Sequence, residues 1–460
     1  MFSMRGRRDH PDSASAGTTQ GPALPDELLL HVFSFLAVKP FGRDGQTAWA
    51  AGYDTIDPNY ITPRSSALFA ALHVSRSWHA TAAELFYAEV YLATVNSCVL
   101  FSRTIKRNPA LAKLVQKVVF PRETQILSAH PNPGLDVKLL IGKLAVGHGA
   151  LSTAVKTIVQ LCINLEHCII RSGATSRLLD HFGVVDLAPR LVELDMIATT
   201  TWSKNPLAKR SLRQLARTPL SLDCSAADVS FPRLQTLHLI LCDEIRDCGP
   251  SLRRTFPALR QLFLSSTWIE IGELVPMLCA LQDTLRVLGF SSVHDPADAE
   301  TPDMLTTLDK HLPVTNLQLD ELRLTYLGYI PWPNCLVNIA RQATLRVLHI
   351  DSSHLHRFWC LPPRLDTLVV YQDTVGSNMC YVLGTAGILK HALPGWVETS
   401  PSLRLISVRC AMFGTDNYYD YTTFSWAMVA VLLRPFCDRY NVHLNIDLLV
   451  RCKLGHAATD

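Results

Sequence analysis

The chain has 460 residues, with 43 Lys and Arg against 40 Asp and Glu, and a formal net charge of +3. Hydrophobic residues make up 48%, which excludes a mainly disordered chain, and so small a charge predicts no nucleic-acid partner. The length suits a small module plus one large domain or two medium ones. Thirteen scattered cysteines without a Cys-x-x-Cys pair predict a reducing cytoplasmic or nuclear compartment and no metal site, and we expect no cofactor.

Residues 1–22 are polar and basic and contain no apolar segment, so we expect a disordered tail and no secretory signal. A weak nuclear-import signal at Arg5, Arg7 and Arg8 is the alternative for this tail. The longest apolar run near the other end, residues 426–433, is too short to cross a bilayer. The sequence therefore predicts no membrane partner.

Residues 24–36, LPDELLLHVFSFL, predict a short helix with more apolar surface than it can bury alone. Pro25 suits the first helical turn, and Asp26 and Glu27 lie at the positive end of the helix dipole. We expect a partner to cover this surface, and the alternative is an ordinary buried helix of a larger domain. The apolar stripe and the residues that widen it are Leu24, Leu28, Val32 and Leu36, with Leu29, Phe33 and Phe35.

A second block, LHVSRSWH at residues 72–79, follows a stretch with several Gly and Pro at 37–64, which predicts an inserted loop. Helical spacing resumes at Ser65, and an Ala-rich helix at 78–87 closes a small all-helical module. Together the two blocks resemble the F-box, except that Ser75 stands where the family often has Cys and the loop between the blocks is long. The matching residues are Leu24, Pro25, Leu28, Leu29, Val32, Phe33, Leu36, Leu72, Val74, Ser75, Arg76 and Trp78.

The F-box is the module with which substrate receptors dock on the Skp-type adaptor of cullin–RING ubiquitin ligases. The resemblance implies an F-box domain over residues 23–92, with a Skp-type adaptor and, through it, a cullin–RING core as partners. It also implies which side chains form or support the adaptor interface, some by packing the module itself. These are Leu24, Pro25, Leu28, Leu29, Val32, Phe33, Leu36, Val74 and Trp78.

From about residue 108 onward, one phrase recurs: a small loop, often with Pro, and then Leu-x-x-Leu-x-Leu. Between fourth positions of this phrase, Leu237 to Leu262 is 25 residues and Leu262 to Leu288 is 26. A period in the mid-twenties is typical of leucine-rich repeats, although the copies are irregular. The copies lie at 164–172, 189–199, 232–242, 257–267, 284–292, 319–327, 343–353, 363–373 and 401–410, with a looser one at 108–120.

The repeats predict an α/β fold over residues 93–455, a leucine-rich-repeat-like solenoid with a curved parallel sheet. Each phrase is expected to form a strand, and apolar stretches such as 271–285 are expected to form helices that return the chain. A general α/β domain with a parallel sheet is the alternative. Near the end, 424–440 predicts a helix and 441–449 a final strand, which together would cap the solenoid.

Residues alternate between the two faces of each strand, so Leu237 and Leu239 are expected in the core and His238 on the concave face. That face is an extended recognition surface in such solenoids, and we expect a protein substrate there. A merely solvated sheet face is the alternative. The residues predicted to line it are Asp195, His238, Phe263, Arg323, Thr325, His349, Asp351, Tyr371 and Arg409. The segment 416–424, with Tyr418, Tyr419 and Tyr421, predicts a loop that either binds or packs over the end.

No motif of a serine hydrolase elbow, a phosphate-binding loop, a dinucleotide site or a zinc protease occurs in the chain, so we do not expect an enzyme. By its resemblance the protein looks like the substrate-recognition subunit of a Skp–cullin–F-box ubiquitin ligase, located in the cytoplasm, the nucleus or both. The alternative is a repeat-protein interaction scaffold without ligase activity. An enzyme on an α/β fold remains as a third class.

Overall fold

The structure is a computed structural model of the chain, and it divides into a small unit and a large one. The described part of the small unit ends at Phe86, and that of the large unit begins at Tyr87. The predicted tail at 1–22 and the predicted inserted loop at 37–64 lie outside the described residues. The structure describes residues 28–29, 69–92, 94–120, 150–151, 153–172, 188–198, 221–223, 230–240, 244–246, 249–265, 271–291, 317–325, 342–358, 360–373, 379–413 and 419–451.

The small unit is helical in the part that the structure describes. Its longest element is α4 (Arg76–Ala88), whose last two residues belong to the large unit, and residues 28–29 and 69–71 are also helical. Ser75 lies just before α4, where its hydroxyl accepts a hydrogen bond from the backbone N–H of Trp78 at 3.1 Å, as an N-cap does. A small core forms around Leu29, which packs with Ala71 and Ala82.

The large unit contains one open sheet of twelve strands, all parallel to their neighbours. In sheet order the strands are β1 (Glu89–Tyr91), β2 (Lys117–Val119), β3 (His167–Ser172), β4 (Glu193–Ala198), β6 (Thr236–Ile240), β8 (Gln261–Ser265), β9 (Val287–Ser291), β10 (Glu321–Thr325), β11 (Val347–Asp351), β12 (Thr367–Asp373), β13 (Leu405–Phe413) and β14 (His443–Arg451). A second sheet pairs β5 (Ser221–Asp223) with β7 (Glu244–Arg246).

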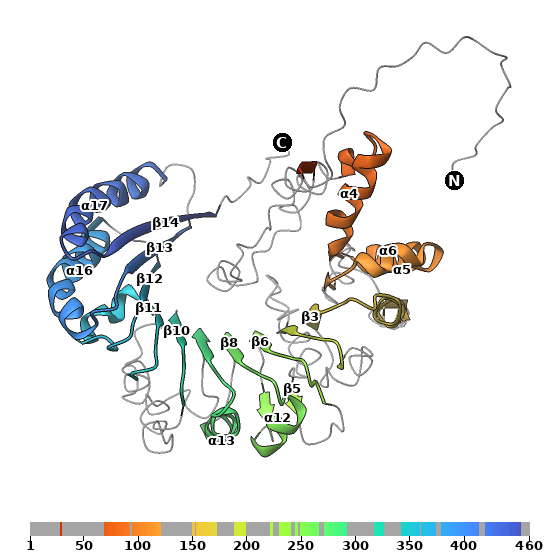
Figure 1. Cartoon of the computed structure of the whole chain (residues 1–460), viewed down its shortest axis with the longest axis horizontal. Helices are drawn as coiled ribbons and strands as arrows, with labels where there is room; N and C mark the ends of the chain where they lie inside the picture. Colours follow the sequence, from red (N-terminus) through yellow and green to blue (C-terminus); the bar gives the residue numbers. More distant parts are fainter. Residues whose placement is uncertain are drawn as a thin grey trace, which may run out of the picture. The chain divides into compact units, whose positions relative to one another are not determined.

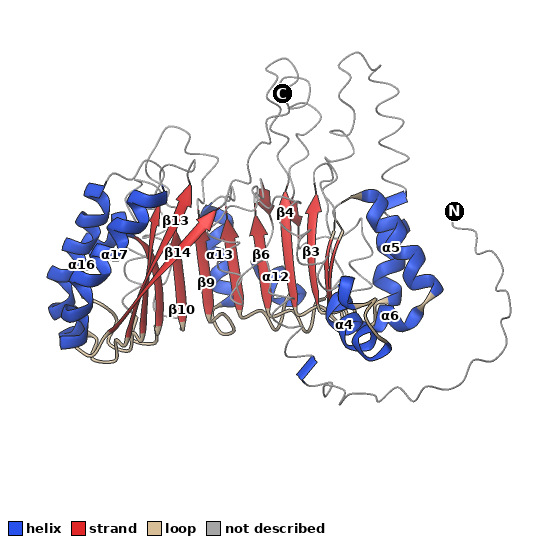
Figure 2. Cartoon of the chain, turned by 90° about the horizontal axis from the view of Figure 1, so that it is seen from above, coloured by secondary structure: helices blue, strands red, loops and turns tan. Residues whose placement is uncertain are grey.

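Helices accompany the sheet along one side. Within the large unit the strands follow an arc, and α12 (Gly249–Thr255), α13 (Ile271–Leu281), α16 (Met379–Thr399) and α17 (Tyr419–Arg439) lie on its outer side (Figure 1). The strand arrows all point the same way (Figure 2). The prediction of an α/β fold with a parallel sheet is therefore confirmed. Other helices are α5 (Val95–Arg107), α6 (Pro109–Leu114) and the 3-10 helix η4 (Ser352–Arg357), and residues 153–161 are helical too.

The predicted phrases stack in register. Leu237 pairs with Leu262, and Leu262 pairs with Leu288, so the spacings of 25 and 26 residues in the sequence correspond to one step across the sheet. The backbone carbonyl of the residue that precedes a strand usually accepts hydrogen bonds from two backbone N–H groups of the next repeat. The oxygen of Arg260, for example, accepts from the backbone N–H of Arg286 at 2.8 Å and of Val287 at 3.0 Å. The same carbonyl thus fixes both the turn and the register of the following strand.

The core lies between the sheet and the outer helices. Its strand residues are the leucines of the phrases, and Leu237, Leu262 and Leu348 are fully buried. The helix residue Trp396 is also fully buried, and its indole N–H donates to the carbonyl of Phe358. Burial of the indole with a hydrogen-bond partner removes the cost that an unpaired N–H would carry there.

Three elements differ from the sequence-based expectation. The strand β1 was not predicted, because three residues between helices carry no leucine phrase, and it lies at the end of the range expected for the helical module. The predicted loop at 416–424 is wrong from Tyr419 onward, because α17 begins there and not near residue 424. The final strand β14 extends to Arg451 and pairs with β13 over its full length.

Among the described residues, none of the helices combines the length and the apolar composition needed to cross a membrane.

The leucine core generates a stability prediction. Changing Leu348 to Ala deletes a fully buried side chain from the middle of the sheet. We expect the free energy of unfolding to fall by about 2–5 kcal/mol, because the removed atoms lose burial and leave a cavity. Urea unfolding followed by circular dichroism measures this. The control, Val431→Ala in α17, removes a side chain that is 72% exposed and should change the free energy little. Equal effects of the two changes would contradict this assignment of the core.

Candidate functional site

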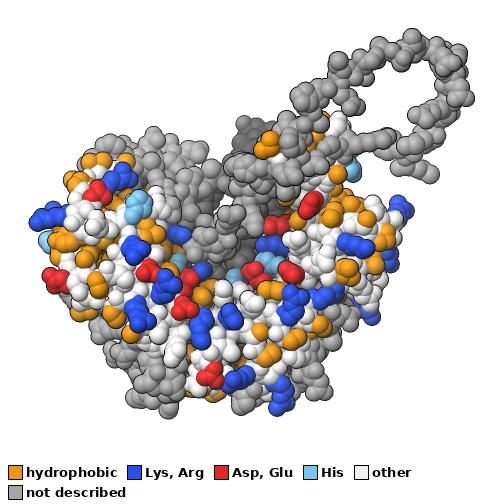
Figure 3. Space-filling view, viewed as in Figure 1, with side chains coloured by type: hydrophobic (Ala, Val, Ile, Leu, Met, Phe, Trp, Pro, Cys, Tyr) orange, Lys and Arg blue, Asp and Glu red, His pale blue; other side chains and the backbone are white. Residues whose placement is uncertain are grey.

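The residues predicted to line the concave face do share one face of the sheet, opposite the leucine core. His238 pairs with Phe263 across β6 and β8, and Arg323 pairs with His349 across β10 and β11. In the next two strands of the sheet, Tyr371 of β12 pairs with Arg409 of β13. Charged and histidine side chains gather along the inner side of the arc (Figure 3). The alternation of the sequence thus places these side chains on the correct face.

Their exposure is lower than a recognition surface requires. Arg409 is half-buried, and each of the other predicted residues is no more than 8% exposed. Adjacent parallel strands lie about 4.8 Å apart, so large side chains in one row across a curved sheet crowd one another. The residues concerned are Asp195, His238, Phe263, Arg323, Thr325, His349, Asp351 and Tyr371.

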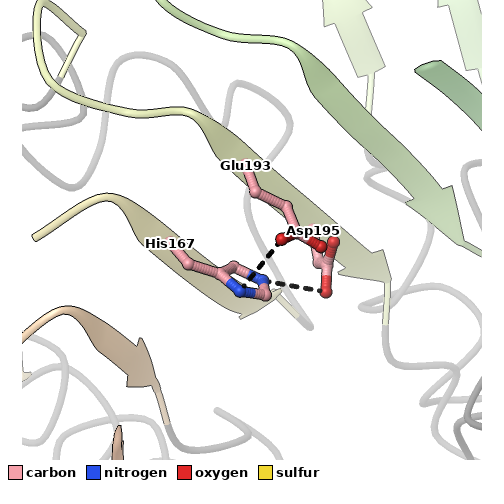
Figure 4. Close-up of side chains that lie close together, drawn as sticks. All are labelled: His167, Glu193 and Asp195. Carbon is pink, nitrogen blue, oxygen red and sulfur yellow. Dashed lines mark hydrogen bonds and ion pairs between the residues drawn. The ribbon is translucent and has the colours of Figure 1, made fainter. Parts of the chain in front are cut away.

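One cluster of charged side chains forms where β3, β4 and β6 meet. Nδ1 of His167 lies 3.2 Å from Oε2 of Glu193, and Nε2 of the same ring lies 3.4 Å from Oδ2 of Asp195. Figure 4 shows the imidazole ring facing the two carboxylates, with a dashed line to each. From the neighbouring strand, Nδ1 of His238 lies 3.1 Å from Oδ1 of Asp195. We call His167, Glu193, Asp195 and His238 the β3–β6 cluster.

Electrostatics keep Asp195 charged although it is buried. Burial alone would raise its pKa, but the nearby His238, the hydrogen bond and charge of His167, and Lys117 lower it to about 2. Burial has the opposite consequence for His238, whose pKa it lowers although Asp195 and Glu193 favour the charged ring. The centre of the β3–β6 cluster therefore holds an ionised carboxylate beside an imidazole that burial favours as neutral.

A second cluster spans β10 to β13. Glu321 accepts a hydrogen bond from Nε of Arg323, and its Oε1 lies 3.0 Å from Nε2 of His349. Nδ1 of His349 is 3.3 Å from the hydroxyl of Tyr371, which also accepts a hydrogen bond from Nη1 of Arg409 at 3.3 Å. We call these five residues the β10–β13 cluster. It contains four of the predicted residues, already engaged with one another.

Charge and burial oppose each other in this second cluster too. Burial lowers the pKa of His349. This effect outweighs the opposite effect of Glu321, and the resulting pKa is about 4. For Glu321, burial favours the neutral form, but hydrogen bonds and charges from His349 and Arg323 lower the pKa to about 2. Because His349 is neutral near pH 7, the guanidinium of Arg323 is the charge that stabilises the Glu321 carboxylate there.

Phe263 joins the two clusters. Its ring centroid lies 4.4 Å from that of His238 in an edge-to-face arrangement, and Cζ of Arg323 lies 4.8 Å from the same centroid. Phe263 and Arg323 are two strands apart, and the register places Gly289 between them. A glycine has no side chain to separate them, so the guanidinium can reach the ring face and form a cation–π contact.

Sequence reasoning missed His167, Glu193, Glu321 and Gly289. Glu193 and Glu321 each stand two residues before a predicted position, and His167 is the first residue of β3; a period of two places all three on the same face. Applying the alternation over the whole strand finds them. The sequence does not show which of these side chains lie close together. Strands that are neighbours in the sheet, such as β4 with Asp195 and β6 with His238, are separated by a long connection.

The residues predicted to contact the adaptor divide between surface and core in the small unit. Leu28 and Val74 are 51% and 59% exposed, and the neighbouring Phe69 is 55% exposed. Leu29 is only 3% exposed and Trp78 is partly buried against the same core, so these two support the unit from inside. The remaining predicted residues, Leu24, Pro25, Val32, Phe33 and Leu36, lie outside the described residues.

Most of the described cysteines fit the predicted role of small core residues, whereas Cys279 is half-buried and Cys360 is exposed. Burial raises the pKa of the Cys98 and Cys162 thiols to about 12, which disfavours the thiolate needed for nucleophilic chemistry. Cys168 is fully buried in the same core.

No protein-family model matches the chain, and no curated protein matches it significantly.

The buried His349 generates a pH prediction. Its folded pKa of about 4 lies below the usual 6.5, so between these values the unfolded chain binds a proton that the folded chain does not. The free energy of unfolding should therefore fall as the pH is lowered, by about 2 kcal/mol between pH 7 and pH 5 from this residue. Below about pH 4.5 protonation of Glu321 in the unfolded chain adds to the loss.

Urea unfolding at a series of pH values tests this dependence. His349→Gln keeps hydrogen-bonding capacity but no longer titrates, and its stability should depend less steeply on pH than that of the wild-type chain. His391→Gln, at an exposed position in α16, should retain the wild-type slope. If wild type and His349→Gln show the same slope, the protonation of His349 is not coupled to folding.

Proposed function

We propose that this chain is the substrate-recognition subunit of a Skp–cullin–F-box ubiquitin ligase. The small helical unit would bind the Skp-type adaptor, and the large unit would bind a protein substrate. The chain would carry out no bond chemistry itself. It would raise the effective concentration of a substrate lysine near the conjugating enzyme, which converts a bimolecular encounter into an intramolecular one. A cytoplasmic or nuclear location belongs to the same proposal.

The observation that carries the proposal is the apolar surface of the small unit. Leu28, Phe69 and Val74 are each more than half exposed, while the unit has only a small core around Leu29. Leaving such side chains in water costs stability, and burying their exposed halves at an interface recovers about half of the roughly 1.5–3 kcal/mol that complete burial of each would contribute. Two of the three, Leu28 and Val74, belong to the F-box pattern of the sequence.

The substrate side of the proposal rests on the sheet face opposite the leucine core. Its predicted residues are engaged in the two clusters, and Arg409 is the least buried of them. Arg is a frequent anchor of interfaces because its planar guanidinium both stacks and donates several hydrogen bonds. A substrate contact at Arg409 would use the rim of the β10–β13 cluster and leave its buried pairs in place.

Replacing two exposed apolar residues by Asp tests the adaptor interface. The double variant Leu28→Asp, Val74→Asp should lose at least about 3 kcal/mol of binding free energy, or more than a hundredfold in affinity, because it places two charges in a desolvated contact. Calorimetric titration of the full chain with a Skp-type adaptor measures the loss. The matched control, Val431→Asp, changes an exposed apolar residue of α17 and should bind like wild type.

The outcomes separate the competing functions. A folded wild-type chain that does not bind the adaptor would exclude both the F-box and the ligase. Binding of the adaptor without recruitment of a cullin in a pull-down would instead support an interaction scaffold. Retention of wild-type affinity by the double variant would place the adaptor interface elsewhere on the chain.

A further inference from the structure

The β3–β6 cluster contains a group of potential metal ligands that has no role in the proposed function. One imidazole and two carboxylates converge from adjacent strands, and a second imidazole approaches from β6. Neutral imidazole and carboxylate are ligands of divalent transition metals, Zn²⁺ in particular. The cysteine spacing gave no reason to expect a metal, and the cluster contains no cysteine. It is created by strand register, which brings together residues far apart in the sequence.

The geometry is close to that of a coordination site. One donor atom each from His167, Glu193 and Asp195 can be chosen so that all three lie within 4.8 Å of one another. Zinc bonds of about 2.0–2.2 Å place tetrahedral ligand atoms about 3.4 Å apart, so small side-chain rotations would close the set. The side chain of Glu193 is 35% exposed, whereas Asp195 is 3% exposed. Glu193 therefore stands at the rim, where an ion would enter.

A second observation concerns two buried polar atoms beside these ligands. Oδ1 of Asp195 and Nδ1 of His238 are buried and lie 3.1 Å apart, but neither atom has a hydrogen-bond partner among the described residues. Buried polar atoms without such partners are costly and uncommon in folded proteins. A cation beside this carboxylate would add to the compensation that the two imidazoles give its buried charge. His238 would then hold the carboxylate from the other side, as neighbours of metal ligands do.

We propose that His167, Glu193 and Asp195 bind a divalent transition-metal cation, with Zn²⁺ as the best-fitting ion. Three protein ligands leave further coordination positions for water or for a donor group from a bound partner. The metal would tie β3 to β4 on the face of the sheet that we expect to bind substrate. The site stands independently of adaptor binding, because its residues lie in the large unit.

The test is a titration of the chelator-treated full chain with Zn²⁺, with exposed thiols alkylated beforehand, followed by calorimetry. We expect one Zn²⁺ per chain. The variant Glu193→Gln, at the rim, should weaken the affinity at least tenfold without unfolding the chain. The matched control is Glu166→Gln, which changes an exposed carboxylate that pairs with Arg233 and does not belong to the cluster. It should bind Zn²⁺ like wild type.

X-ray absorption at the zinc edge supplies a readout of the ligands themselves. We expect nitrogen and oxygen neighbours at about 2.0–2.2 Å and none of the sulfur at about 2.3 Å that cysteine ligation produces. Absence of stoichiometric binding would mean that a proton on the cluster compensates its charge, and would overturn the proposal. Sulfur ligands, or an unchanged affinity in Glu193→Gln, would overturn it as well. Tighter binding of Mg²⁺ than of Zn²⁺ would exclude a transition-metal site.

Discussion

In-register stacking of parallel strands is the constraint on which the rest of the large unit depends. Each step across the sheet pairs a leucine with a leucine, as Leu237, Leu262 and Leu288 do. Because side chains alternate along a strand, one register places all the leucines in the core and all the intervening residues on the opposite face. A slip by one residue would bury the charged row among helices and expose the leucines, so the apolar core and the polar face enforce the same alignment.

The polar face is stabilised by pairing within itself. Glu321 with Arg323, and Asp195 with two imidazoles, show how buried charges are tolerated when each has an opposite charge or a hydrogen bond close by. Gly289 contributes by having no side chain between Phe263 and Arg323. This self-pairing has a consequence for recognition. A partner gains little from side chains that already satisfy one another, so the half-buried rim is better placed for recognition than the row itself.

Particular residues show how much of the structure could be predicted from the sequence. The alternation within the phrases predicted the strands, the core leucines and the face of His238, His349 and Tyr371, because a period of two is a local property. It did not predict β1, which is short and has no leucine phrase. Nor did it predict that His167 contacts both Glu193 and Asp195. Such contacts arise only when the register of two strands is known, and their burial depends on the whole molecule. Leu28 and Leu29 show the same limit, since one apolar pattern contains both an exposed and a buried side chain.

The connection between β4 and β6 shows why so irregular a chain can keep so regular a sheet. Leu194 and Leu237 are neighbours across the sheet, as Leu262 and Leu288 are, although many more residues separate them in the sequence. Doubling the length of a flexible connection costs only about 0.6 kcal/mol of loop-closure free energy, far less than one buried leucine contributes. Insertions between strands are therefore nearly neutral for folding. Over evolutionary time such a scaffold can acquire new segments at its strand ends while its core residues stay in place.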